Sequence, residues 1–204
     1  WLLSEPIADP FLLEHLELDM QAEKGDDVRY TATETLRIQQ GGLKTLAFEL
    51  YDVIDQFSFQ KGPRQVKLTS VTDAAGKALD FFHLDDRLVV FFPQELAEGS
   101  VQKLTFKIEG DFLLHPEGNS YWELAIGPWF PAPAAYMSNR FTAHGTLRVA
   151  KPWRPITPGR TIRSVEEGAY NLNEFTLENP VQFLALFGGN YIPYEETRNG
   201  LKIR

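Results

Sequence analysis

The sequence contains no cysteine in its 204 residues. Without thiols the chain can form no disulfide, no zinc–thiolate site and no iron–sulfur cluster, and it has no cysteine nucleophile. The absence of cysteine fits reducing and oxidising compartments alike, so it does not locate the protein.

Clusters of basic residues are also absent. The chain has 20 Lys and Arg against 28 Asp and Glu, which gives a formal net charge of −8. A chain of this charge repels the phosphate backbone, so we expect no nucleic-acid partner. An acidic surface of this kind serves solubility.

Long apolar runs are missing as well. The opening, WLLSEPIADP, lacks the basic region and the apolar core of a signal peptide, and no stretch is long enough to predict a membrane span. The opening is typical of a chain entered part-way, so we expect residues 1–13 to be a lead-in. No segment repeats apolar residues at helical intervals between caps, which predicts very little helix.

Alternation of apolar and polar residues is the pattern that is present. In HLELDMQA (15–22) the residues at even numbers are apolar, and the strict alternation favours a strand although Leu, Glu, Met and Ala are good helix formers. In VRYTATETLRIQQ (28–40), Tyr30, Ala32, Leu36 and Ile38 share one face and threonines occupy the other. Turn signals recur about every ten residues. We therefore predict an all-β fold, an antiparallel β-sandwich.

One segment departs from this pattern, because residues 121–133 read YWELAIGPWFPAP. Trp and Tyr suit sugar stacking and peptide recognition, and they equally fill the ends of sandwich cores. Glu123 stands inside the cluster and could anchor an amine. A second proline-rich loop, KPWRPITPG (151–159), cannot be a central strand. The candidate residues for binding or interdomain contact are Trp122, Glu123, Trp129, Phe130, Trp153 and Arg154.

The sequence contains no recognisable catalytic or metal-binding motif. Its four histidines are at least 29 residues apart, so none forms the paired spacing that grips zinc on a helix. His115 and Glu117 begin a zinc-deaminase signature whose cysteine pair is absent. GNSYW (118–122) has Trp122 where a nucleophile elbow needs glycine. Adjacent carboxylates such as Asp26–Asp27 point to opposite faces of a strand and sit in polar turns, so they predict no acid–base pair. We predict no catalytic residue and no metal site in this chain.

The order of the segments resembles the N-terminal domain of the M1 family of zinc aminopeptidases, also called gluzincins. The matching pieces, in order, are HLELDMQA, YTATETLRI, LAFEL, VKLTSVTDAAGKALDF, RLVVFFPQELAEGSVQKLTFKIEGDF, GPWFPAP, FTAHGTLRVAKPW and VQFLALFGGNY. The resemblance covers residues 14–194. Many members carry a Pro-Cys-x-Asp-x-Pro turn where this chain has GPWFPAP, so the chain is similar to a tryptophan–proline variant instead.

The resemblance implies a saddle-shaped β domain that packs on a following catalytic domain of the same polypeptide. That catalytic domain carries an HExxH zinc helix and a glycine-rich loop, and neither occurs in this sequence. We therefore expect no peptide hydrolysis by this chain, no cofactor within it, and zinc in the following domain. Residues 195–204 would be the exit segment toward that domain. In the family, this domain lends one acidic or amide side chain to the substrate's amino end. Glu123 is the candidate for that role on its chemistry and location.

Two other functions remain open at this point. The chain could be a stand-alone β-sandwich that binds carbohydrate or peptide, with Trp122, Trp129 and Trp153 as platforms. It could also be a structural spacer, in which case those tryptophans would be buried. If the chain is instead a domain of a larger peptidase, one face should expose more apolar area than a monomer usually does, and the aromatic and KPWRP loops are the candidates for that face.

Overall fold

A computed structural model describes residues 9–23, 27–51, 65–113, 121–125, 127–192, 194, 196–198 and 201–203. Within these residues the chain forms fifteen strands and no helix, which confirms the predicted all-β class. No described helix is therefore available to cross a membrane. His115, Glu117, residues 118–120, Asp26 and residues 1–8 lie outside the described residues.

The strands form four sheets. The largest has seven strands in the order β11-β12-β9-β1-β2-β7-β4, and three smaller sheets have the orders β3-β6-β5, β10-β13-β8 and β14-β15. The bounds are β1 (Phe11–Ala22), β2 (Val28–Ile38), β3 (Leu43–Glu49), β4 (Val66–Thr72), β5 (Phe81–Leu84), β6 (Arg87–Leu96), β7 (Val101–Gly110), β8 (Tyr121–Leu124), β9 (Phe141–Ala150), β10 (Arg154–Ile156), β11 (Arg160–Glu167), β12 (Tyr170–Val181), β13 (Leu186–Gly189), β14 (Glu196–Arg198) and β15 (Leu201–Ile203).

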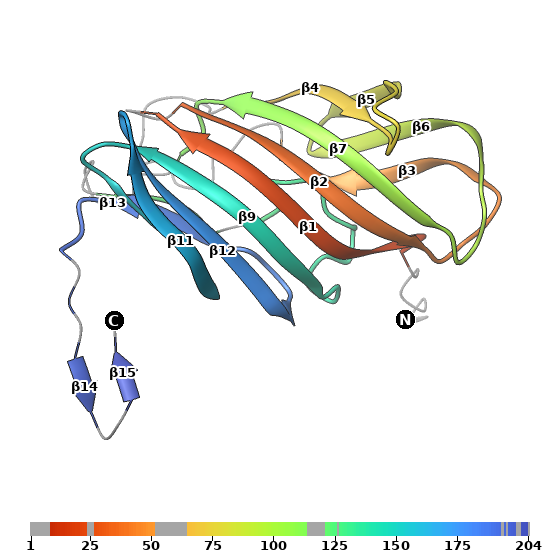
Figure 1. Cartoon of the computed structure of the whole chain (residues 1–204). Coiled ribbons are helices and arrows are strands. Elements are labelled where there is room, and N and C mark those ends of the chain that lie inside the picture. Colours follow the sequence, from red (N-terminus) through yellow and green to blue (C-terminus); the bar gives the residue numbers. More distant parts are fainter. Residues whose placement is uncertain are drawn as a thin grey trace, which may run out of the picture.

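The seven-stranded sheet is long and curved (Figure 1). Its strands pair antiparallel except β1 and β9, which run parallel. Alternation gives it one apolar and one polar face, as expected for a sheet that is solvated on one side. The apolar residues Leu16, Leu18, Met20 and Ala22 of β1 are all buried, as their spacing predicts. On the outer face threonines pair across strands, with Thr33 Oγ1 3.0 Å from Thr105 Oγ1.

Two of the three smaller sheets lie against the apolar face, one toward each end. Figure 1 places β3, β6 and β5 at one end and β13 at the other, while the β14–β15 hairpin stands apart near the C-terminus. Phe48 of β3 packs against Phe11 of β1 and Phe106 of β7, with ring centroids 4.7 and 5.5 Å apart. A single apolar core therefore joins the large sheet to the small ones.

Two local features of the late segments follow from their residue types. The EEG turn joins β11 to β12 as a hairpin, and Gly168 in that turn has a φ of 56°, which an L-residue rarely adopts. The proline-rich KPWRP loop contributes β10, which is an edge strand of its sheet, where proline is tolerated.

Candidate functional site

The aromatic segment forms a buried corner between the large sheet and the β10–β13–β8 sheet. Trp122, Trp129 and Phe130 are all buried. Phe130 links the corner to β9, because its ring lies 5.7 Å from the ring of Phe141. These three side chains pack in the chain's own core and offer no surface for a ligand in this conformation.

Trp129 is held at its indole, its ring and its backbone. Its Nε1 donates a hydrogen bond to the carbonyl of Leu184 at 3.3 Å. The Tyr30 hydroxyl donates to the carbonyl of Trp129, and the two rings meet edge to face at 5.6 Å. A buried tryptophan with its N–H satisfied is a structural element of a core.

Trp122 lies against a glycine of the neighbouring strand. Gly188 pairs directly with Trp122, and a Cβ on Gly188 would lie 2.4 Å from the indole Cε2 and Nε1. Position 188 therefore has no room for a side chain while the indole occupies it. Within the described residues the Trp122 Nε1 has no hydrogen-bond partner.

Glu123 points the other way from Trp122, because successive residues of a strand face opposite sides. In the burial pattern of β8, Trp122 and Leu124 are buried whereas Tyr121 and Glu123 are half-buried. Glu123 therefore belongs to the outer face of the β10–β13–β8 sheet. Of the candidate residues in the aromatic segment, it is the one with a side chain on an accessible face.

The register of this small sheet sets out the neighbours of Glu123. Directly paired residues of antiparallel strands share a face. Two rows of side chains therefore cross the outer face: Ile156, Phe187 and Glu123 in one row, and Arg154, Gly189 and Tyr121 in the other. The face combines one carboxylate, one guanidinium and aromatic surface.

Tyr191 adds a further aromatic ring to this face. A Cβ on Gly189 would lie 2.7 Å from Cε2 of Tyr191 and 2.8 Å from Cβ of Tyr121. The Tyr191 ring thus lies over the bare backbone of Gly189, beside Tyr121. Partial burial raises the pKa of the Tyr191 phenol, and the negative charges of Tyr121, when ionised, and of Glu123 raise it further.

The KPWRP loop divides between the core and the surface. Trp153 is half-buried and packs against the core, and its carbonyl accepts a hydrogen bond from Asn171 Nδ2 at 2.6 Å. Arg154 is exposed at the start of β10. The structure thus brings Arg154 and Glu123 to one sheet face, on strands that flank β13, and places Trp153 beneath.

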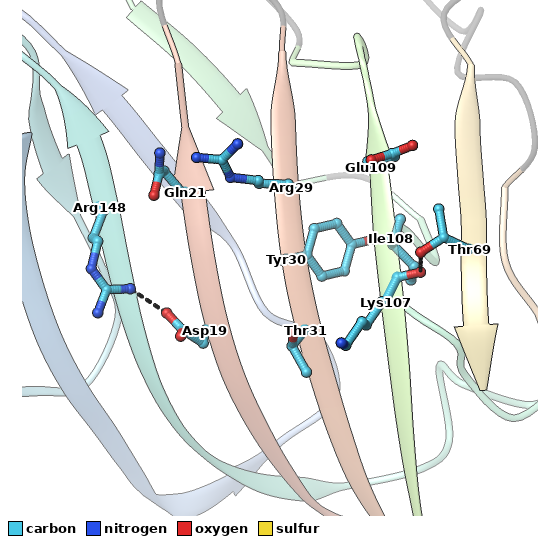
Figure 2. A pocket seen from close by; sticks show the side chains of 10 residues that line it. All are labelled: Asp19, Gln21, Arg29, Tyr30, Thr31, Thr69, Lys107, Ile108, Glu109 and Arg148. Atoms are coloured by element: carbon cyan, nitrogen blue, oxygen red, sulfur yellow. Dashed lines mark hydrogen bonds and ion pairs between the residues drawn. The ribbon is translucent and has the colours of Figure 1, made fainter. Parts of the chain in front are cut away.

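A separate hollow of about 340 Å³ lies on the outer face of the seven-stranded sheet. Figure 2 shows its polar lining, with Arg148 of β9 pointing to Asp19 of β1. Arg29, which also lines the hollow, pairs with Glu23 at 3.3 Å. The hollow is open, and these charges are paired on the solvated side of the sheet, so it has the character of an ordinary polar surface.

Glu34 is the one buried carboxylate among the described residues, and the sequence analysis missed it. It lies on the apolar face of β2, paired with Leu16 of β1 and Leu104 of β7, and is 0% exposed. Neither carboxylate oxygen has a hydrogen-bond partner in the described part of the chain. Burial raises its pKa well above the usual value. Alternation in VRYTATETLRI could have found it, because position 34 falls in register with Ala32 and Leu36.

Exposed apolar side chains gather in a place that the sequence did not indicate. Phe82 and Leu84 of β5 and Phe91 of β6 are exposed, and the pairings Phe82↔Val89 and Thr45↔Phe91 put them on the outer side of the β3–β6–β5 sheet. The aromatic loop, which was a candidate for such a face, is buried instead.

No group of three or more His, Asp or Glu side chains that could hold a metal ion occurs among the described residues. His144 accordingly pairs with a single carboxylate, Glu174, at 3.1 Å.

Comparison with known proteins finds a likeness of structure and none of sequence. No family profile matches the chain, and no curated protein matches it. The solved M1 zinc metallopeptidase from Deinococcus radiodurans, as a mutant bound to a Tyr-Ser-Ala substrate, matches with a TM-score of 0.72 and 13% identity over 95% of this chain and 46% of that chain. The same metallopeptidase in another crystal structure matches with a TM-score of 0.71 and 14% identity over 88% of this chain and 42% of that chain. A two-domain M1 zinc metallopeptidase mutant bound to L-arginine matches with a TM-score of 0.72 and 14% identity over 88% of this chain and 42% of that chain.

The chain thus spans less than half the length of the solved structures that it matches. At these identities the likeness is one of fold. Nearly all of this chain has the fold of one part of an M1 zinc metallopeptidase, as the resemblance in the sequence predicted.

Proposed function

We propose that this chain is the non-catalytic N-terminal domain of a larger M1-type zinc metallopeptidase. The observation that carries the proposal is the pair of coverages, 95% of this chain against 46% of the matched metallopeptidase. A complete match to less than half of an enzyme is expected of one domain of that enzyme. The domain would pack on a catalytic domain that follows in the same polypeptide.

We assign the outer face of the β10–β13–β8 sheet to one wall of the substrate cleft. Support comes from the geometry, because this face carries Glu123 among aromatic residues and the chain leaves the domain next to it, after β13. A carboxylate beside aromatic rings favours a cationic ligand. Glu123 would bind the free amino end of a peptide, and the matched metallopeptidase was solved with a tripeptide substrate.

Zinc belongs to the following domain in this proposal. The described residues contain no set of side chains that could hold a metal ion. This domain's part in the reaction would be to bind and orient the substrate.

A stand-alone module that binds carbohydrate or peptide finds less support. Stacking platforms need exposed rings, whereas Trp122 and Trp129 are buried and Trp153 is half-buried against the core.

The test compares the 204-residue chain with the full polypeptide encoded by its gene. We expect an HExxH helix beyond Arg204, about one zinc per full-length molecule by mass spectrometry, and hydrolysis of aminoacyl p-nitroanilides by the full-length protein alone. Glu123→Ala should raise KM by about 10- to 100-fold, as for loss of a charged hydrogen bond of about 1.5–3 kcal/mol. The KM of Glu123→Gln should lie between those of the wild type and Glu123→Ala. A full-length protein without zinc would overturn the assignment to a metallopeptidase. An unchanged KM in Glu123→Ala would overturn the assignment of the cleft wall.

A further inference from the structure

Tyr191 is the residue at which the chain leaves the folded domain. Its ring is half-buried over Gly189, whereas the next residue, Ile192, is 92% exposed and Tyr194 is 70% exposed. Of the described residues after β13, Tyr191 is thus the last that packs on the β10–β13–β8 sheet, and it does so on the face that carries Glu123.

The seat of this ring depends on a glycine. Position 189 pairs with Arg154 on one side and Tyr121 on the other, so its own side chain would project from the outer face between them. The glycine leaves that place open, and the Tyr191 ring fills it at distances that exclude even a methyl group. A side chain at position 189 would therefore have to displace the ring.

The ring also lies on the same sheet face as Glu123, at the neighbouring residue pair, and diagonal neighbours of this kind are within reach of aromatic and long side chains. The Glu123 charge acts on the Tyr191 phenol, and Glu123 lies two residues from Tyr121, which touches the same seat. An ammonium group held by Glu123 would therefore lie within reach of the Tyr191 ring. Aromatic faces attract alkylammonium groups most strongly where water is excluded.

We propose that Tyr191, seated on Gly189, is a second binding residue of the Glu123 site and forms the aromatic wall against which a substrate's ammonium group is held. This inference rests on the proposed function and names a residue that determines selectivity for the charged amine. The ring supplies the interaction, and the hydroxyl does not.

The experiment uses the full-length protein and two competitors of similar shape, L-leucinamide, which competes as an alternative substrate with an apparent Ki, and its deaminated analogue 4-methylvaleramide. Tyr191→Ala should raise Ki for L-leucinamide about tenfold, with the Ki of 4-methylvaleramide within about twofold. Tyr191→Phe should keep the wild-type values because it retains the ring. Gly189→Ala should reproduce the Tyr191→Ala defect, since the added methyl displaces the ring without removing it. Tyr194→Ala is the matched control, because Tyr194 is exposed and lies beyond the sheet; it should leave both Ki values unchanged.

The outcomes separate the two proposals. If the wild type shows no preference for L-leucinamide over 4-methylvaleramide, the amine site and this inference both fail. If Glu123→Ala loses the preference and Tyr191→Ala retains it, only this inference fails. Equal weakening of both inhibitors in Tyr191→Ala would assign the residue a purely structural role and would also overturn it.

Discussion

Replacing Glu34 by methionine should stabilise the domain. Glu34 is 0% exposed, both its oxygens lack a hydrogen-bond partner among the described residues, and it pairs with the buried Leu16 and Leu104. An unpaired polar group in such a place costs about 1–3 kcal/mol. Methionine has a similar length and adapts to irregular gaps. In acidic solution, where the carboxyl is neutral in both the folded and the unfolded state, we therefore expect the free energy of unfolding to rise by about 1–3 kcal/mol. Tm should rise by about 2–4 °C for each kcal/mol in a chain of this size.

The stabilisation should grow as the pH rises. Burial raises the pKa of Glu34 in the folded state well above its usual value near 4.5. Below pH 4.5, the usual pKa, the carboxyl is protonated in both the folded and the unfolded state, so it adds no pH dependence to the free energy of unfolding. Above it the unfolded state ionises while the folded state stays neutral, so the wild type loses about 1.4 kcal/mol per pH unit until the folded-state pKa is reached. Glu34→Met lacks this loss.

Urea unfolding of both proteins at pH 5, 6, 7 and 8 measures the effect. The informative quantity is the difference between the variants, because other groups titrate in both. Glu17→Met is the matched control, since Glu17 lies on the polar face of the adjacent strand and pairs with Lys103 at 3.2 Å; its effect should stay within about 1 kcal/mol. A destabilised Glu34→Met, or a difference that is independent of pH, would refute the reasoning.

Three further predictions concern the corner and the exposed apolar face. Trp129→Phe removes the hydrogen bond to Leu184 and part of a buried ring, so urea unfolding should show a loss of about 2–4 kcal/mol; a loss below 1 kcal/mol would contradict the packing described. Gly188→Ala forces a methyl onto the Trp122 indole and should cost about 1–3 kcal/mol, accompanied by a change in tryptophan fluorescence; unaltered melting would show that the indole can move. Phe82→Ser should leave Tm within about 2 °C and reduce binding of the dye ANS, because Phe82 is exposed on the outer side of its sheet; unchanged dye binding would place the apolar surface elsewhere.

The sequence predicted the strands of the large sheet best where a strand buries one face, which β1 and β2 do and the edge strand β11 does not. Alternation holds along the whole of β2, along β1 after its bulge between Leu13 and His15, and in the middle of β7, where every second residue enters the core. The pairing of β1 with β9, which run parallel although far apart in the chain, left no local signal. Such a pairing is fixed by the joint burial of both strands and not by a turn.

The same alternation also predicts the burial of Glu34. Its position in VRYTATETLRI puts it on the core face as firmly as Ala32 or Leu36. Residue type favoured the surface, because a glutamate is almost never fully buried without a partner. Periodicity was the stronger constraint, since a strand cannot rotate one side chain to the opposite face without moving its neighbours.

The aromatic segment illustrates the same rule in four residues. YWEL was part of a stiff, proline-rich corner in the sequence, and its short length between glycines and prolines hid the strand β8. Once β8 pairs with β13, alternation alone divides the candidates: Trp122 must enter the core and Glu123 must leave it. Burial of the indole over Gly188 then fixes the direction of the carboxylate on the other side. Trp122, a candidate platform in the sequence, therefore anchors the strand so that Glu123 faces outward. On the proposed function, Gly188→Ala, which crowds the indole, should weaken amine binding in the full-length protein without touching the ligand.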